Sequence, residues 1–189
     1  MLKTLSFIGE NINKKDISWG VGGSLLLHFY NLIDKPNDID ILVDEKDATK
    51  LNKCMLSIGK TKQVKRSDPF RTTYFSKYSL NDIDIDIDVM GGFGIQHNDG
   101  GYKLSFEKKS IVAHKKINGV DIPLCSLEDW YVLYWLIPNK QEKALLIENY
   151  LRANGVKYPH LLKNALKQHL PLHVKESVLS LLGEVKGHR

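Results

Sequence analysis

Two short segments alternate acidic and aliphatic residues with a period of two, and they constrain the fold more than any other feature. The first spans residues 38–43 and the second spans 82–89. Successive side chains of a β-strand point to opposite faces, so each segment is predicted to be a strand with its carboxylates on one face. Carboxylates placed so close together are costly unless something neutralises them. For Asp82 and Asp84 we expect plain solvation of an exposed face.

The rest of the first two-thirds of the chain has mixed α and β patterns. Helical spacing covers residues 2–12, 24–30 and 45–57, the last of these after a cap at Asp44. Strand patterns cover 17–22, 71–78, 111–113 and 120–123.

The character of the sequence changes at Ser126, after which only helices are predicted. Ser126 to Asp129 has the form of a capping box and opens an aromatic helix that Pro138 ends. Asn139 is expected to cap a second helix that reaches Asn154, and two more helices cover 161–168 and 172–182. The predicted fold class is α+β: a small mixed-sheet lobe over residues 1–124, followed by a C-terminal helical lobe over 125–189.

Composition narrows the class of protein. With 189 residues, 42% of them hydrophobic, the chain can bury one sizeable core with a modest appendage. Neither a membrane-spanning run nor a secretory leader is recognisable, so we expect a cytoplasmic protein with no membrane partner. Cys54 and Cys125 lie far apart, which favours neither a disulfide framework nor a cysteine-rich zinc site.

Charge is unevenly distributed along the chain. The net charge is +5, and residues 139–189 hold 9 of the 27 basic and 4 of the 22 acidic residues, leaving 18 of each in residues 1–138. A basic tail permits a nucleic acid partner. We do not favour one, because a chain of this length leaves little room for a dedicated RNA-binding domain.

A glycine-rich turn separates the strand over 17–22 from the helix that follows. Gly22 and Gly23 permit close approach of another group to the backbone, and Ser24 is predicted to cap the helix. A phosphate group would be favoured at such a turn.

Taken together, these residues resemble the DNA polymerase β-like nucleotidyltransferase superfamily, in particular its small prokaryotic antibiotic and minimal nucleotidyltransferases. The shared pattern is Gly23-Ser24, thirteen intervening residues, Asp38-Ile39-Asp40, and a carboxylate on a later strand, either Asp88 or Asp86. The resemblance covers about residues 17–90 by motif and the rest by general layout.

The resemblance implies roles for these residues. Asp38 and Asp40 would hold two Mg²⁺ ions on a nucleoside triphosphate, and a third carboxylate would complete the metal site that activates the acceptor hydroxyl. We choose Asp88 as this third residue because it lies at the end of its strand, while Asp86, two residues away on the same face, stays open as a metal ligand.

The resemblance also suggests groups for the phosphates. Gly23 and Ser24 would hold the β and γ phosphates. From the basic composition of this part of the chain, and not from the resemblance, we expect one or more of Lys65, Arg66 and Arg71 to neutralise charge nearby.

The predicted function is transfer of a nucleoside monophosphate, with AMP expected, from a triphosphate to a hydroxyl of a small molecule or a protein. The alternative is a non-catalytic nucleotidyltransferase-like binding protein, such as an antitoxin-type partner. Transfer onto an RNA end is a third possibility. The aromatic residues of 130–135 are expected to form the seam between the lobes, and stacking on a base or a planar substrate is the alternative. Lys143 is expected to face solvent, and the alternative is that it reaches a phosphate across a cleft between the lobes.

Overall fold

The computed structural model of the protein describes residues 1–64, 67–80 and 85–184. Its helices are α1 (Leu2–Asn13), α2 (Gly23–Phe29), α3 (Ala48–Ile58), α4 (Leu127–Leu136), α5 (Gln141–Asn154), α6 (Pro159–Ala165) and α7 (Leu172–Glu184), with short 3₁₀ helices η1 (Glu45–Asp47) and η2 (Lys108–Ser110). Its strands are β1 (Trp19–Val21), β2 (Ile39–Val43), β3 (Lys60–Lys62), β4 (Tyr74–Ser79), β5 (Ile87–Gly91), β6 (Gly94–His97), β7 (Gly100–Lys103), β8 (Ala113–Ile117) and β9 (Val120–Leu124).

Within the described chain, seven strands form one mixed sheet in the order β3-β4-β5-β2-β1-β9-β8. The central pair β2 and β5 is parallel, while β1 is antiparallel to β2 and β4 is antiparallel to β5. This sheet and the helices after it confirm the predicted α+β class. The division of the chain at residue 124 stays a prediction.

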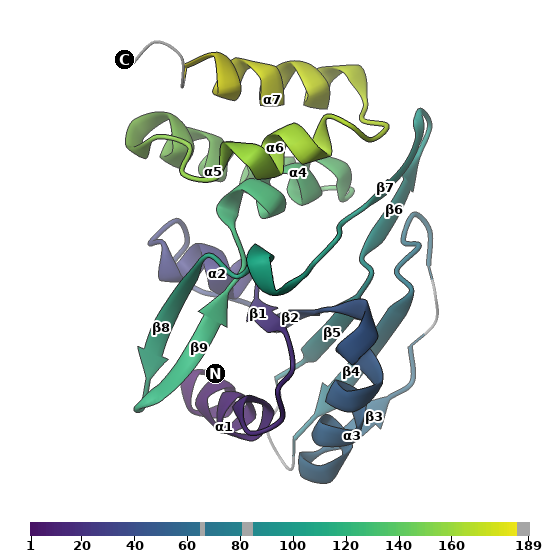
Figure 1. Ribbon diagram of the computed structural model, residues 1–189, viewed down its shortest axis with the longest axis vertical. Helices are drawn as coiled ribbons and strands as arrows, with labels where there is room; N and C mark the ends of the chain where they lie inside the picture. The colour runs from purple at the N-terminus through teal and green to yellow at the C-terminus, as the bar shows by residue number, and fades with distance from the viewer. Residues whose placement is uncertain (65–66, 81–84, 185–189) are drawn as a thin grey trace.

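Helices cover both faces of the sheet (Figure 1). Helices α1 and α3 lie on one side, and α2 with the stacked helices α4 to α7 lies on the other. Helix α1 buries Leu5, Ile8 and Ile12 completely, as the predicted amphipathic spacing requires. No helix within the described ranges is long and apolar enough to span a bilayer.

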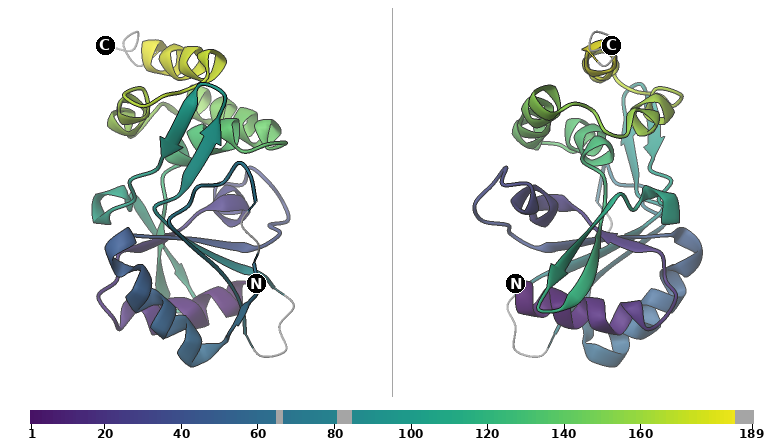
Figure 2. Two further views of the ribbon diagram at one scale, coloured as in Figure 1. Left: turned by 90° about the vertical axis from the view of Figure 1, so that its right-hand side faces the viewer. Right: turned by 60° about the vertical axis from the view of Figure 1, so that its left-hand side comes forward.

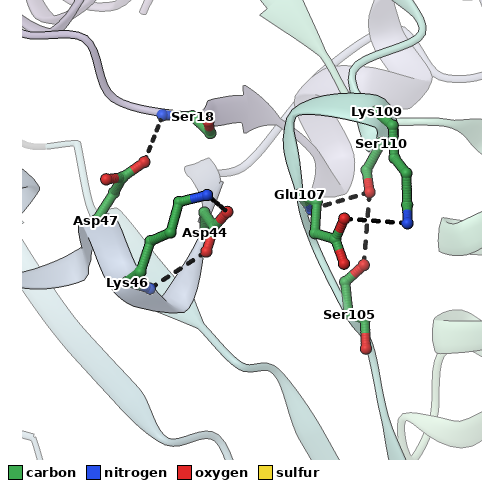
Figure 3. A network of polar contacts seen from close by, with 8 residues as sticks. All are labelled: Ser18, Asp44, Lys46, Asp47, Ser105, Glu107, Lys109 and Ser110. Atoms are coloured by element: carbon green, nitrogen blue, oxygen red, sulfur yellow. Dashed lines mark hydrogen bonds and ion pairs between the residues drawn. The ribbon is translucent and has the colours of Figure 1, made fainter.

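A capped turn fixes the point where β2 ends. The carboxylate of Asp44 accepts a hydrogen bond from the backbone N–H of Lys46 at 3.2 Å, which confirms the predicted cap. The carboxylate of Asp47 accepts from the backbone N–H of Ser18 at 2.9 Å, as Figure 3 shows. The chain that leaves β2 is therefore tied to the segment that enters β1, and this stabilises the pairing of these two strands at the end nearest η1.

A buried carboxylate, that of Glu128, connects α4 to the segment between α5 and α6. Ser126 caps α4 by accepting the backbone N–H of Asp129 at 3.0 Å. The next residue but one, Glu128, is 2% exposed, and its carboxylate accepts the backbone N–H groups of Lys157 and Tyr158 at 3.1 and 3.0 Å. These charge-assisted bonds fix the segment between α5 and α6 against α4.

The hairpin of β6 and β7 was not predicted, although its Asn98-Asp99-Gly100 turn is a recognisable hairpin signal. It rises from the sheet towards the C-terminal helices (Figure 2). There, Gln168 exchanges two hydrogen bonds with the backbone of Lys103, and an imidazole nitrogen of His97 lies 3.1 Å from the carbonyl oxygen of His169. The hairpin thus connects the sheet to the segment between α6 and α7.

Two details of the predicted elements are wrong. Strand β5 begins only at Ile87, so residues 85 and 86 of the alternating pattern are not part of the strand. Asp82 and Asp84 lie outside the described residues. Helix α5 begins at Gln141 after Lys140, and no side chain caps it, because Asn139 adopts a positive φ of 60° instead.

We predict that Glu128→Ala lowers the free energy of unfolding by about 2 kcal/mol, because it leaves two backbone N–H groups without their charged acceptor. The measurement is chemical denaturation at pH 7. Glu142→Ala on the exposed first turn of α5 is the matched control and should stay within about 0.5 kcal/mol of wild type. Equal, small effects of the two substitutions would contradict the anchoring role of Glu128.

Candidate active site

A cavity of about 1100 Å³ lies between the sheet and the helical lobe. Asp38, Asp40 and Asp88 line it from the sheet side. Side chains of α4 and α5, among them Trp130 and Lys143, line it from the other side. The structure therefore brings together in one cavity the three carboxylates that the sequence singled out on two separate segments.

The parallel pairing of β2 with β5 explains how two of the carboxylates meet. Asp40 and Asp88 are directly opposite each other in the register of these strands, so their side chains share one face of the sheet. Asp38 lies two residues before Asp40 and just ahead of β2. Burial, together with the negative charges of Asp38 and Asp88, raises the pKa of Asp40.

Two glycines make room for this arrangement. Gly23 has a φ of +61°, and a Cβ atom there would lie 1.7 Å from the Oδ2 atom of Asp40. A Cβ atom on Gly22 would lie 2.2 Å from the indole ring of Trp130. Any larger residue at either position must displace the side chains that line the cavity. The close approach predicted for this turn is confirmed, and the group that approaches is a carboxylate.

Ser24 has a different role from the predicted helix cap. Helix α2 begins at Gly23 after Gly22, and no side chain caps it. The Ser24 hydroxyl, which is almost fully buried, donates to the Oδ1 atom of Asp38 at 3.1 Å and accepts the backbone N–H of Asn37 at 3.0 Å. Ser24 therefore orients Asp38 from across the turn, a contact that the thirteen intervening residues do not reveal in the sequence.

Lys77 is a site residue that the sequence analysis missed. It stands opposite Asp88 in the antiparallel register of β4 and β5, and its ammonium group lies 3.0 Å from the Oδ1 atom of Asp88. Burial alone would lower the pKa of Lys77, but the hydrogen bond to Asp88 and the charges of Asp88 and Asp86 outweigh it and raise that pKa. The pKa of Asp88 is also raised, because the effect of burial is larger than the opposing effect of Lys77.

The prediction that Lys143 faces solvent is wrong. This side chain lines the cavity, and its ammonium group lies 5.3 Å from the centroid of the Tyr134 ring. Burial and the neighbouring charge of Lys140 lower the pKa of Lys143, while Asp38 and Asp40 act in the opposite direction. A cationic group is thus held opposite the carboxylates by a helix that is distant in the sequence.

Two of the four aromatic residues of α4 line the cavity, and the other two pack within the helical lobe. Trp130 and Tyr134 line the cavity and pack together with ring centroids 5.2 Å apart. Tyr131 and Trp135 are not among the lining residues, and the Tyr131 hydroxyl donates to Glu148 of α5. The seam between the lobes is therefore also one wall of the cavity.

Two other predicted residues lie at the margins of this site. Asp86 is not among the cavity-lining residues; its carboxylate pairs with Lys62, whose hydrogen bond lowers the pKa of Asp86. Arg71 lines the cavity, but its guanidinium pairs with Asp68 at 2.7 Å. Lys65 and Arg66, also suggested for the phosphates, lie outside the described residues.

The residues of the cavity are chemically suited to a hard divalent cation. Asp38, Asp40 and Asp88 supply the oxygen ligands that Mg²⁺ prefers. Burial, and after it the neighbouring negative charges, raise the pKa of both Asp40 and Asp88, and a bound cation would counter these effects. Across residues 1–64, 67–80 and 85–184, no group of three acidic, histidine or cysteine side chains is already arranged as a metal centre. A hydrogen bond from Ser24 holds Asp38, and an ion pair with Lys77 holds Asp88 instead.

Comparison with known protein families gives a match over most of the chain. The model of the aminoglycoside-2''-adenylyltransferase family matches residues 4–145. None of the curated protein sequences matches the chain significantly. The family match confirms the nucleotidyltransferase resemblance that was based on Gly23-Ser24 and Asp38-Ile39-Asp40.

Solved structures show the same fold at low sequence identity. A protein from Thermotoga maritima assigned to the nucleotidyltransferases has a TM-score of 0.59 and 22% identity, over 81% of this chain and 93% of that one. ANT(2'')-Ia in complex with adenylyl-2''-tobramycin has a TM-score of 0.56 and 12% identity, over 97% of both chains. A lincomycin-bound lincosamide adenylyltransferase has a TM-score of 0.50 and 13% identity, over 77% of this chain and 95% of that one.

We predict that Asp40→Asn stabilises the metal-free protein, and more so at higher pH. The folded protein, in which the pKa of Asp40 is raised, keeps a proton that the unfolded chain releases above about pH 4. Wild-type stability is therefore lost as the pH rises from there towards the raised pKa, whereas asparagine carries no such penalty.

The measurement is the Tm in the presence of a chelator at pH 5 and pH 8. Asp99→Asn, at an exposed position in the turn between β6 and β7, is the control and should leave the Tm unchanged at both values. A lower Tm for Asp40→Asn at pH 8 than for wild type would show that the crowding of carboxylates is not destabilising.

Proposed function

Because the chain belongs to the aminoglycoside-2''-adenylyltransferase family, we propose that this nucleotidyltransferase uses a divalent metal to move AMP from ATP to a hydroxyl group of a small molecule. The observation that carries the proposal is the convergence of three carboxylates beside the Gly23-Ser24 turn, in a cavity large enough for two substrates. Such a cluster of carboxylates is suited to cation binding rather than to general acid–base work alone.

The carboxylates would hold the metal. In this proposal Asp38, Asp40 and Asp88 would hold two Mg²⁺ ions, which would neutralise triphosphate charge and lower the pKa of the acceptor hydroxyl. The hydroxyl gives its proton to a carboxylate of this cluster as its oxygen bonds to the α-phosphorus, the bond from the α-phosphorus to the bridging oxygen of the β-phosphate breaks, and pyrophosphate leaves. Asp88 is the third ligand in preference to Asp86, since Asp88 lies beside Asp40 and lines the cavity, whereas Asp86 pairs with Lys62.

The triphosphate would lie between the glycine turn and α5. Gly23 and Ser24 are buried and are not among the cavity-lining residues, and the Asp40 carboxylate occupies the space where a Gly23 side chain would be. In this proposal their backbone and hydroxyl groups would reach the phosphates at the margin of the cavity, beside Asp40. Lys143 faces the same carboxylates from α5 and supplies a cation on the opposite side of the phosphates. Arg71 would act at the outer margin, where it must exchange its bond to Asp68 for one to the nucleotide.

Calorimetric titration of ATP, GTP, CTP and UTP tests the donor and the metal together. We expect ATP to bind wild type most tightly, to require Mg²⁺, and to bind Asp40→Asn at least about thirtyfold more weakly, because the mutant lacks a central oxygen ligand. Asp99→Asn is again the control. ATP binding of equal strength with and without Mg²⁺, or in wild type and Asp40→Asn, would refute a metal-dependent site.

The identity of the third carboxylate is tested by counting bound ions. Mn²⁺ substitutes for Mg²⁺ at oxygen sites and is detected by electron paramagnetic resonance. With α,β-methylene-ATP present, wild type and Asp86→Asn should each bind two Mn²⁺ ions, and Asp88→Asn should lose one. Loss of an ion from Asp86→Asn but not from Asp88→Asn would exchange the two assignments.

A further inference from the structure

The cavity face of the sheet carries a charged row of side chains followed by an apolar row. In the register of β2, β5 and β4, Asp40, Asp88 and Lys77 lie side by side. Two residues further along, and therefore on the same face, Met90 lies opposite Phe75. Two residues of a strand span about 7 Å, so an apolar surface begins one short step from the carboxylates.

Other apolar side chains extend this surface. Phe70 and Phe93 line the cavity and pack edge to face, with ring centroids 6.0 Å apart, and Ile137 lines it from the end of α4. Phe75 is 36% exposed, which is a high value for a large apolar side chain at the wall of a cavity. This part of the cavity is therefore available to an apolar group of a ligand.

The described lining of the cavity offers little negative charge to a cationic ligand. Its described lining contains four acidic residues, namely Asp38, Asp40, Asp68 and Asp88, and four basic residues, namely Arg71, Lys77, Lys140 and Lys143. Asp38, Asp40 and Asp88 form the proposed metal site, so Asp68, whose side chain is 85% exposed, is the one acidic residue of the described lining outside that site. A ligand with several ammonium groups would meet Lys140 and Lys143 with a single exposed carboxylate to compensate, which is costly in a partly desolvated site.

The order of the strands separates the donor side from the acceptor side. The Gly23-Ser24 turn, which holds the phosphates in the proposed function, follows β1 on one side of β2. Met90 and Phe75 lie on the other side, on β5 and β4. The apolar row is thus next to Asp88 and on the side of β2 opposite the phosphate turn, which is the side of the acceptor in the proposed function.

We infer that the acceptor is an uncharged, amphiphilic hydroxyl compound, whose hydroxyl lies at the carboxylate row and whose apolar or aromatic group covers Phe75 and Met90, rather than a polycationic aminosugar. This inference rests on the proposed function for the position of the nucleotide. It goes beyond it by stating the chemical class of the acceptor and by excluding the class that the name of the family describes.

Three probes test the class of acceptor: 4-nitrophenyl glucoside, which is neutral with an aromatic group, glucose, which lacks that group, and tobramycin, which is polycationic. Each is titrated by calorimetry into protein saturated with Mg²⁺ and α,β-methylene-ATP. We expect the nitrophenyl glucoside to bind at least about tenfold more tightly than glucose or tobramycin, because its ring buries apolar area against the row. If it binds no more tightly than either of them, the inference is wrong.

Variants locate the binding to the apolar row. Phe75→Ser should weaken binding of the nitrophenyl glucoside about fivefold while leaving affinity for α,β-methylene-ATP unchanged. The matched control is Phe7→Ser, at a position 47% exposed on α1 and on the other side of the sheet, and it should change neither affinity. An unchanged affinity in Phe75→Ser overturns the assignment of this row.

The titrations are repeated on nucleotide-free protein, so that the proposed function and the proposed acceptor class can be rejected independently. Absence of α,β-methylene-ATP binding to wild type contradicts the proposed function. The order of affinities among the three probes decides the acceptor class in either state.

Discussion

Asp40 is placed where three structural constraints meet, and the arrangement of the site depends on all of them. The register of β2 and β5 sets it beside Asp88, the turn at Gly23 brings the backbone against its carboxylate, and the chain before β2 adds Asp38 on the same side. Each contact concentrates negative charge or removes water, and both effects favour the protonated acid. The surrounding fold maintains this unfavourable arrangement, which is typical of a site whose residues are selected for binding rather than for stability.

Cations from two different parts of the chain partly offset this charge. Lys77 comes from the sheet and contacts Asp88 directly, whereas Lys143 comes from the helical lobe and acts through the cavity. In the ligand-free site, these two lysines therefore offset part of the negative charge of the carboxylates. A metal ion would have to displace them, and a triphosphate could bind beside them. Because Lys143 and Trp130 belong to α5 and α4, the site is complete only when the helical lobe packs on the sheet.

Residues close together in the sequence were predicted from local patterns. Of the residues brought together by strand pairing, Asp88 was placed with Asp40 only through the family resemblance, and Lys77 was missed. The alternation around Asp38 and Asp40 and the cap at Ser126 depend on local geometry, which the sequence displays directly. The pairing of Lys77 with Asp88 depends on the register of β4 and β5, and no local pattern specifies that register. The bond from Ser24 to Asp38 was missed for a related reason, since a serine at the start of a helix is usually a cap.

The contact between Gly22 and Trp130 has a practical consequence. Of the three tryptophans in the chain, only Trp130 is among the described residues that line the cavity, and its indole ring lies against the glycine turn. A change in the polarity or hydration of that turn alters the surroundings of a single fluorophore, while Trp19 and Trp135 lie elsewhere in the fold. The protein therefore carries an intrinsic optical reporter at its cavity, and its emission can follow the occupancy of the turn without any attached label.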